Sequence, residues 1–361
     1  MIAIVQSVIK KFSKVTLKEA SKKLTLYVSM LIISKERKNY ASMARENNIA
    51  YKKVYVSNKD ADNYSKECMK FLHETIRSNS TKENLGYLII DFTILDKHFS
   101  EHIPGVTYDY GGSKKRIEKG FSTGFILWSN GKVVIPFDYT LWIRKKDAKD
   151  LYKKKPELVM ELILAARRNN IPFDEVRLDG AFASVEILDF IEQQKLGITA
   201  RIASNRVIET DDEKNQLSKH SLLQMKGNEK YKTVQGLYKG HLLYFTAQKR
   251  NATNNKKDVV FIVSNVIRTP KEHVQAYSER WPTEKYFRSG KQHIGLAHCQ
   301  STNADKQKFH IFSVMVAYAI LQCIKYDKKK QSVEEVIHDI RRRKNMSDLS
   351  EYIDLEQTIM S

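Results

Sequence analysis

The sequence predicts an α/β fold built around a mixed sheet, and three observations support this prediction. The chain has 361 residues, of which 42% are hydrophobic, so it can bury a substantial core. Short apolar runs bounded by turn residues, such as residues 87–91, are typical of buried strands. Longer stretches with the apolar spacing of amphipathic helices alternate with these runs, as they do in α/β domains.

The predicted elements follow one another in a definite order. A strand at 87–91 precedes a hairpin of residues 121–128 and 133–142, whose Asn130-Gly131 pair is a strong turn signal. Alternating helices and strands then follow at residues 156–170, 175–178, 184–194 and 198–202. This is the order of an RNase H-like mixed sheet, although other α/β layouts also fit it.

Composition divides the chain into further parts. Residues 1–84 are helical in pattern, basic and free of Pro and Gly, so we expect a separate DNA-binding domain there. The RNase H-like domain is expected over residues 85–204 and 258–324. A β-rich insertion at 205–257 interrupts it, and a basic helical tail at 325–361 follows it.

Residues 40–55 have the outline of a helix-turn-helix. A helical stretch is followed by a polar break at Asn47-Asn48 and by a second short stretch rich in Tyr and Lys. In such a motif the second helix enters the major groove of DNA. A plain helical bundle with a polar turn has the same pattern, so both interpretations stay open.

The charge balance indicates a polyanionic partner. Lys and Arg total 62 against 42 acidic residues, which gives a net charge of +20. A positive field of this size favours nucleic acid first and an anionic membrane surface second. A lysine-rich proteome with generally basic surfaces would give the same composition.

Cysteine usage and the N-terminus point to a reducing compartment. Cys68, Cys299 and Cys323 form no CxxC pair, so we expect neither a zinc site nor a disulfide framework. The mildly apolar stretch 1–9 is too short to span a bilayer, and lysines follow it rather than precede it. We therefore expect a cytoplasmic, nucleoid-associated protein without a membrane segment.

Two aspartates are the first candidates for a functional site. Asp91 is expected at the end of the apolar strand 88–93, and Asp179 at the end of the strand 175–178. A charged side chain at a buried strand is costly unless it is paired or bound to a metal ion. If the strands are neighbours, both carboxylates project into one pocket. The alternative is that each Asp caps the turn that follows it.

A third carboxylate lies in a pattern of the form Y-x2-R-x3-E-x6-K. On one continuous helix, offsets of three, four and seven place four side chains on one face, those of Tyr277, Arg280, Glu284 and Lys291. Pro282 predicts a kink or the start of a new helix within this stretch. The alternative is an exposed face with ion pairs, in which Glu284 pairs with Arg280 or Arg288.

Together these motifs resemble the DDE transposases of prokaryotic insertion sequences, specifically the group with a Y-R-E-K signature around its catalytic glutamate. The resemblance covers about residues 86–295. It implies that Asp91, Asp179 and Glu284 form the catalytic triad and hold the metal ions. It also implies that the element ends and the target DNA are the partners, with a homodimer on paired ends.

The resemblance further implies roles for residues around the glutamate. Tyr277, Arg280 and Lys291 match residues that contact DNA phosphates, and Arg288 matches another DNA-contacting cation. Trp281 matches an aromatic on which some members stack a flipped base. The alternative for Trp281 is that it packs into the core beneath the helix.

Three carboxylates without a covalent nucleophile imply metal-dependent phosphoryl transfer. Two Mg²⁺ or Mn²⁺ ions about 3.5–4 Å apart suit such a site, because these ions prefer oxygen ligands. The expected function is cleavage of the element ends and their transfer to target DNA. Two alternatives remain, an RNase H-fold nuclease that does not rejoin strands and a catalytically idle DNA-binding protein derived from a transposase.

Overall fold

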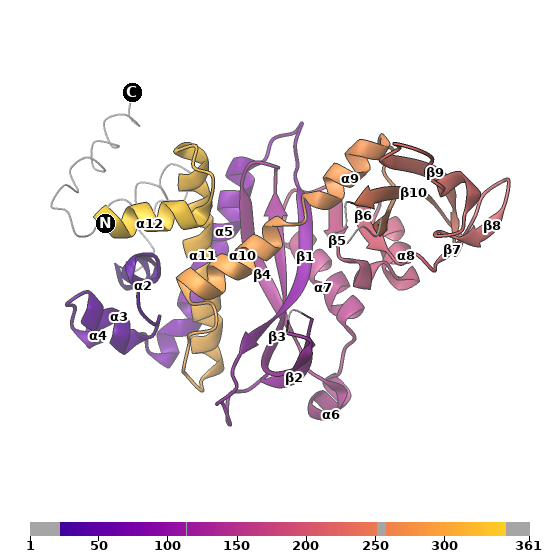
Figure 1. Ribbon diagram of the computed structural model, residues 1–361. Helices are drawn as coiled ribbons and strands as arrows, with labels where there is room; N and C mark the ends of the chain where they lie inside the picture. The colour runs from indigo at the N-terminus through magenta and orange to yellow at the C-terminus, as the bar shows by residue number, and fades with distance from the viewer. Residues whose placement is uncertain (1–21, 113, 251–257, 344–361) are drawn as a thin grey trace.

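The computed structural model describes residues 22–112, 114–250 and 258–343 (Figure 1). Its main feature is an 11-stranded sheet with the order β2-β3-β1-β5-β6-β11-β10-β9-β7-β8, in which β4 also pairs with β3. The half of the sheet that matches the predicted order contains β1 (Tyr87–Asp96), β2 (Thr107–Gly111), β3 (Arg116–Ser129), β4 (Val134–Trp142), β5 (Glu175–Leu178) and β6 (Gly197–Ile202).

The pairing within this half agrees with an RNase H-like sheet. β4, β3 and β1 are antiparallel neighbours, whereas β1, β5 and β6 run parallel. The parallel strands alternate with helices, as parallel pairing requires. The predicted mixed α/β sheet is therefore confirmed.

The predicted hairpin is formed by β3 and β4. Asn130 accepts backbone hydrogen bonds from Lys132 at 2.9 Å and Val133 at 3.0 Å, and Gly131 has a φ of +86°. This left-handed conformation is one that glycine adopts without steric cost. The Asn-Gly pair thus provides the turn that the sequence predicts.

The region predicted as a β-rich insertion continues the same sheet. It contains β7 (Val207–Glu209), β8 (Lys214–Gln216), β9 (Tyr231–Tyr238) and β10 (His241–Arg250), and β11 (Asp258–Ser264) follows it. The β9–β10 turn is made by Lys239 and Gly240, both with positive φ. β10 pairs with β11, and β11 pairs with β6, so the strands of this region extend the sheet beyond β6.

The remaining elements are helical. Those between the strands and before α11 are α6 (Lys145–Ala148), α7 (Lys155–Arg168), α8 (Val185–Gln193), α9 (Pro270–Ser278), α10 (Pro282–Ser289) and a π-helical turn (Gly290–Ile294). Single 3₁₀ turns lie at Lys149–Leu151, Gly180–Phe182 and Ser221–Leu223. The C-terminal helices are α11 (Ala304–Asp327) and α12 (Val333–Arg343). The tail predicted at 325–361 is helical over α12, and residues 344–361 lie outside the described residues.

The helices before β1 are α2 (Lys22–Ile33), α3 (Tyr40–Glu46), α4 (Tyr51–Val54) and α5 (Asn58–Asn79). Figure 1 shows them beside α11 and α12. Tyr27 donates or accepts a 2.7 Å hydrogen bond with His310 of α11, and its ring lies 4.9 Å from that of Phe309. These helices share one hydrophobic core with α11 and with the sheet. A separate domain at 1–84 stays a prediction.

Helix α11 is long and apolar enough to cross a membrane. However, 89% of its apolar stretch is buried inside the protein, where α2, α5, α12 and β4 pack around it. Its composition is that of a central core helix.

The backbone before β1 makes a close approach that only glycine allows. Gly86 has a φ of +81°, and an added Cβ would lie 2.5 Å from the indole nitrogen of Trp128 and 2.6 Å from the Ser129 carbonyl oxygen. That nitrogen donates hydrogen bonds to the carbonyls of Leu85 and Pro172. Trp128 therefore fixes the start of the strand that carries Asp91.

We expect Gly86→Ala to lower the free energy of unfolding by about 2–4 kcal/mol, because it adds a steric clash to the cost of a left-handed backbone. Gly131→Ala is the matched control. Its φ is also positive, but an added Cβ meets nothing within 4 Å, so only the backbone cost of about 1–2 kcal/mol applies. Urea unfolding measures both variants, and equal losses would contradict a close approach at Gly86.

Candidate functional site

The two candidate aspartates lie on neighbouring strands. β1 and β5 pair in parallel with Ile90 opposite Leu178, so Asp91 and Asp179 occupy the next positions along each strand. The condition under which both carboxylates project to one place, that their strands are neighbours, is therefore met. Asp179 directly follows β5, as expected, but β1 continues to Asp96, so the prediction that Asp91 ends its strand is wrong. β1 continues because antiparallel pairing with β3 extends beyond the shorter β5.

Arg280 brings the three candidate carboxylates together. Its Nη1 lies 2.9 Å from Asp91 Oδ2, and its Nη2 lies 3.2 Å from Glu284 Oε1 and 3.8 Å from Asp179 Oδ1. Only 7% of Arg280 is exposed, and its Nε has no hydrogen-bond partner among the described residues. One buried guanidinium thus faces three carboxylates from three distant parts of the chain.

Burial and charge oppose each other at Asp91. Burial raises the pKa of its carboxyl to about 6, although the neighbouring Arg280 guanidinium favours the ionised form. The carboxylates of Asp179 and Glu284 raise the pKa further, because like charges disfavour ionisation. A cation bound between the three carboxylates, in addition to Arg280, would relieve the repulsion between them.

The turn between α9 and α10 positions Arg280 and Glu284. Thr269 and Glu272 form a capping box at the start of α9, which ends at Ser278. Pro282 then occupies the first turn of α10, where its missing N–H is harmless. The predicted helix start at Pro282 is therefore confirmed.

The expectation of one continuous helical face is wrong. Tyr277 lies at the end of α9, Arg280 in the turn, Glu284 in the first turn of α10, and Lys291 in the π-helical turn. The proline breaks the helix, so helical offsets do not relate these residues. Glu284 does pair with Arg280, as the ion-pair interpretation also expected.

Tyr277 and Lys291, the other two residues of the pattern, contact Arg280 and β1, respectively. The Tyr277 ring centroid lies 5.7 Å from the Arg280 guanidinium carbon. Lys291 Nζ donates a 2.6 Å hydrogen bond to Thr93 Oγ1, and Thr93 shares a strand face with Asp91 because it lies two residues further along. Tyr277 therefore lies beside the arginine that faces the carboxylates, whereas Lys291 contacts β1 two residues beyond Asp91.

Trp281 and Arg288 lie on the surface. Trp281 is 48% exposed, so its packing into the core, the alternative that the sequence left open, is not what the structure shows. The exposed Arg288 is 3.6 Å from Glu334 of α12. It is thus paired with the C-terminal helix and not with the three carboxylates.

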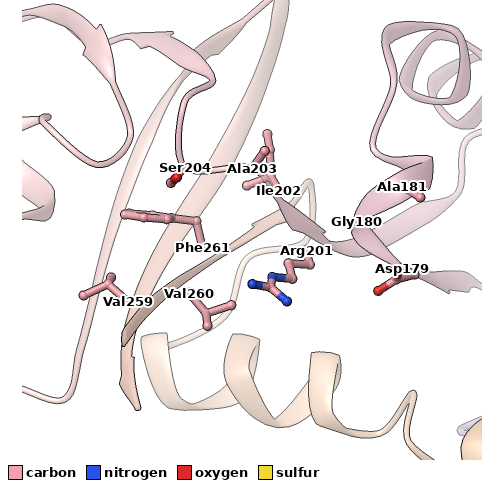
Figure 2. A pocket seen from close by; sticks show the side chains of 10 residues that line it. All are labelled: Asp179, Gly180, Ala181, Arg201, Ile202, Ala203, Ser204, Val259, Val260 and Phe261. Atoms are coloured by element: carbon pink, nitrogen blue, oxygen red, sulfur yellow. The ribbon is translucent and has the colours of Figure 1, made fainter. Parts of the chain in front are cut away.

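A pocket of about 460 Å³ opens beside Asp179. The ends of β6 and β11 line it, with Arg201, Ser204 and Phe261 among the lining side chains (Figure 2). The exposed Arg201 lines the same pocket as Asp179, with its guanidinium turned toward Val260. Sequence reasoning missed Arg201, because no motif distinguishes it from the many other basic residues.

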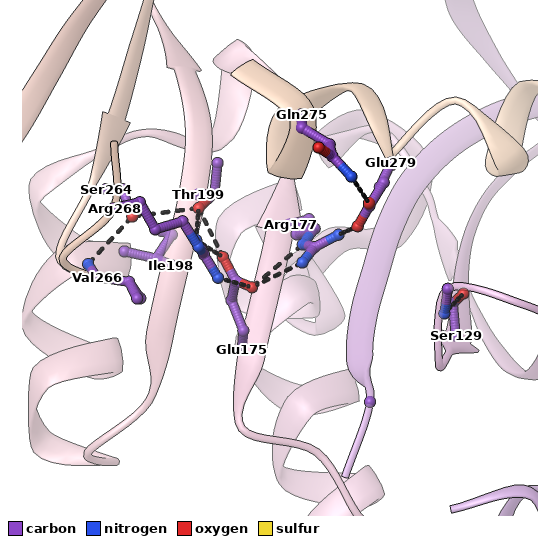
Figure 3. A network of polar contacts seen from close by, with 12 residues as sticks. Ser129, Glu175, Arg177, Ile198, Thr199, Ser264, Val266, Arg268, Gln275 and Glu279 are labelled. Carbon is purple, nitrogen blue, oxygen red and sulfur yellow. Dashed lines mark hydrogen bonds and ion pairs between the residues drawn. The ribbon is translucent and has the colours of Figure 1, made fainter. Parts of the chain in front are cut away.

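A buried polar network lies behind the site (Figure 3). Glu175 of β5 accepts hydrogen bonds from Arg268 at 2.8 and 2.9 Å, Arg177 at 3.0 Å and Thr199 at 2.6 Å. Arg177 also contacts Glu279, the residue before Arg280.

This network connects the strand that leads to Asp179 with the turn that carries Arg280. Sequence reasoning assigned no role to Glu279. Two features of the sequence could have pointed to this ion pair: Glu279 precedes Arg280, and Arg177 lies two residues before Asp179.

The donor set fits a hard divalent cation. Among the described residues, no group of three or more His, Cys, Asp or Glu side chains is arranged to hold a metal ion. The three candidate carboxylates instead face the Arg280 guanidinium. Carboxylate oxygens are the ligands that Mg²⁺ and Mn²⁺ prefer. A cation that replaced the guanidinium would meet three such ligands.

Two family models match the chain. The family model described as DDE superfamily endonuclease matches residues 12–222, which is more than half of the chain. A second family model, described as Transposase DDE domain, matches residues 156–320. No curated protein matches the chain.

The raised pKa of Asp91 gives a test of its burial in the metal-free protein. Because the folded-state pKa of about 6 exceeds the usual value of 3.8, Asp91 stabilises the fold fully below pH 4, and this stability is lost as the pH rises through 6. Between pH 4 and 7.5 the free energy of unfolding of Asp91→Asn should therefore rise by roughly 3 kcal/mol relative to wild type.

Urea unfolding at both pH values, with a chelator present, measures this difference. Burial also raises the pKa of Asp138 to about 6, but that residue is present in both proteins and cancels in the comparison. A difference that is the same at the two pH values would contradict a costly buried charge at Asp91.

Proposed function

Because the chain belongs to the DDE superfamily endonucleases, we propose that Asp91, Asp179 and Glu284 are its catalytic and metal-binding triad. The chain is a DNA-cleaving and transposing enzyme, as both matching family models indicate. The observation that supports this triad is the convergence of all three carboxylates on the Arg280 guanidinium. The broader pattern around Glu284 supports membership of the Y-R-E-K group.

The three carboxylates hold Mg²⁺ or Mn²⁺, two ions in the fully assembled site. When bound, the ions activate the attacking oxygen and stabilise the departing one in an in-line displacement at phosphorus. Asp91 contributes a ligand from a rigid, buried strand, whereas Asp179 and Glu284 lie at the start of less buried segments. The carboxylates therefore fix the position of the reaction and contribute no covalent bond to it.

Basic side chains around the triad orient the DNA. Arg280, no longer bridging the carboxylates, contacts a phosphate at the cleavage site together with Tyr277 and Lys291. Arg201 extends this positive surface along the pocket beside Asp179. Arg288 takes part once its contact with Glu334 opens.

The reaction is the cleavage of the ends of an insertion sequence and their transfer to target DNA. A homodimer assembles on the paired ends, and the protein acts in the cytoplasm on the nucleoid. The net charge of +20 supports this role, because phosphate neutralisation dominates DNA affinity. The endonuclease description of one family model favours a second candidate, a nuclease that cuts without strand transfer.

Asp91→Ala, Asp179→Ala and Glu284→Ala should each abolish strand cleavage and leave DNA binding largely intact. The reason is that these residues hold cations, and removing a carboxylate does not weaken the attraction of a polyanion. Cleavage of a labelled duplex in Mg²⁺ measures activity, and a mobility shift measures binding. Asp174→Ala is the matched control, since that exposed carboxylate lies outside the triad.

Normal cleavage by one of the three variants would remove that residue from the triad. Joining of cleaved ends to a target plasmid separates the two candidate functions. Wild-type protein that cuts completely but joins no ends would favour the nuclease.

Trp281→Ala should fold normally and nick the first strand, but stall before the second-strand step. An exposed aromatic beside Arg280 is well situated to hold an unstacked base, and stacking of about 1–3 kcal/mol offsets part of the extrusion cost. Gel analysis of strand-specific products, with thermal unfolding as a check, measures this. A stable variant that completes both cuts at the wild-type rate would exclude base holding by Trp281.

A further inference from the structure

A second pocket lies between the N-terminal helices and the start of α11, separate from the three carboxylates. It has a volume of about 290 Å³, at the small end of ligand pockets. Four tyrosines and two lysines line it, and none of its lining residues is acidic: Tyr27, Tyr40, Tyr51, Tyr55, Lys38 and Lys306. The composition favours a small aromatic ligand that carries negative charge.

Two of the four tyrosines, Tyr51 and Tyr55, are exposed to the solvent, whereas Tyr27 is buried. The rings of Tyr51 and Tyr55 stack 5.6 Å apart at an angle of 29°, and Tyr40 meets both edge-on. Tyr51 is 49% exposed and Tyr55 36%, so both remain accessible. Exposed aromatic rings of this kind form stacking platforms for nucleobases.

Lys306 indicates that the ligand is an anion. Its Nζ lies 4.1 Å from the Tyr55 ring centroid and 2.7 Å from the Tyr55 hydroxyl, and the residue is only 6% exposed. No carboxylate of the described chain forms an ion pair with it, whereas the neighbouring Lys308 pairs with Asp62. The positive charge of this lysine repels a cationic ligand. Its ammonium can instead form a charge-assisted hydrogen bond with a phosphate.

The adjacent helix is too short to read a duplex. α4 spans only Tyr51–Val54, four residues or about one turn, whereas a recognition helix contacts several bases along the major groove. Lys52 and Lys53 on this turn are exposed and extend the positive charge beside the tyrosines. These features fit a flexible single strand better than a duplex groove.

We propose that this pocket binds one unpaired nucleotide of a DNA strand, with the base against the exposed Tyr51 ring, which stacks on Tyr55, and a phosphate on Lys306. The proposal rests on the proposed function only in that the natural substrate is DNA. It gives residues 40–55 a role in holding single-stranded DNA, for example an unpaired segment beside a cleaved end, in place of major-groove recognition.

Binding of a fluorescein-labelled oligothymidine by the full chain tests this, with a chelator present so that no strand is cut. Fluorescence anisotropy should show that Tyr51→Ala and Tyr55→Ala each weaken binding roughly 5- to 100-fold, the effect of losing one stacked base. Tyr51→Phe should retain affinity. Tyr326→Ala, which removes a tyrosine of similar exposure from the other end of α11, is the matched control.

Salt dependence tests the phosphate contact separately. Binding affinity falls as salt rises, so the slope of log K against log salt is negative. Lys306→Gln should make this slope less steep by about 0.7, the value for one phosphate contact with a single strand. Lys308→Gln, whose lysine is already paired with Asp62, should leave the slope unchanged. Thermal unfolding of each variant confirms that the fold is retained.

Three results would overturn the proposal. The first is oligothymidine affinity in Tyr51→Ala and Tyr55→Ala equal to that of Tyr326→Ala. The second is an equal loss of affinity for a matched duplex, which would assign these residues to duplex recognition. The third is competition by thymidine monophosphate as strong as that by the oligonucleotide, which would identify a free nucleotide as the ligand. The binding assay does not depend on cleavage, because it is run with a chelator. A negative result in it would therefore overturn the nucleotide pocket and leave the proposed catalytic triad untouched.

Discussion

The ion pairs of Arg280 hold together the three parts of the chain on which the candidate site depends. The guanidinium reaches Asp91 in the middle of β1, Asp179 after β5 and Glu284 at the start of α10. Three carboxylates at this distance repel one another, and a buried guanidinium without anions is equally unfavourable. Arg280 and Asp91 therefore make each other's burial tolerable, while Asp179 and Glu284 face the same guanidinium from more exposed positions. The proposed metal site is thus held together, in the metal-free protein, by a cation of the protein itself.

The network behind the site determines what moves when the guanidinium is displaced. Glu175 binds Arg177 and Arg268, and Arg177 also binds Glu279 next to Arg280. Breaking a buried ion pair of this kind is strongly destabilising. The backbone of the α9–α10 turn is consequently tied to β5. In the proposed metal-bound state, Arg280 would therefore leave the carboxylates by a change of side-chain conformation, while the strands and the turn keep their positions.

Much of the architecture could be predicted from the sequence, because strand order and turn chemistry are local signals. The Asn130-Gly131 turn and the helix start at Pro282 follow from such signals, whereas the parallel pairing of β1 with β5 was only a condition that the structure meets. The site was harder, since its geometry comes from tertiary contacts. Helical offsets implied one shared face for Tyr277 to Lys291, but Pro282 splits that stretch into separate elements. Arg280 as the bridge between the carboxylates, Arg201 at the pocket and the Glu175 network have no periodic pattern that sequence reasoning could detect.

The central claim is that the carboxylates around Arg280 form a divalent metal site. Crystals of the full chain soaked in Mn²⁺ test it directly through the anomalous scattering of manganese. We expect anomalous density between Asp91, Asp179 and Glu284, with the Arg280 guanidinium turned away from all three. Density bound elsewhere, with Arg280 still bridging the carboxylates in protein that cleaves DNA under the same conditions, would contradict the claim.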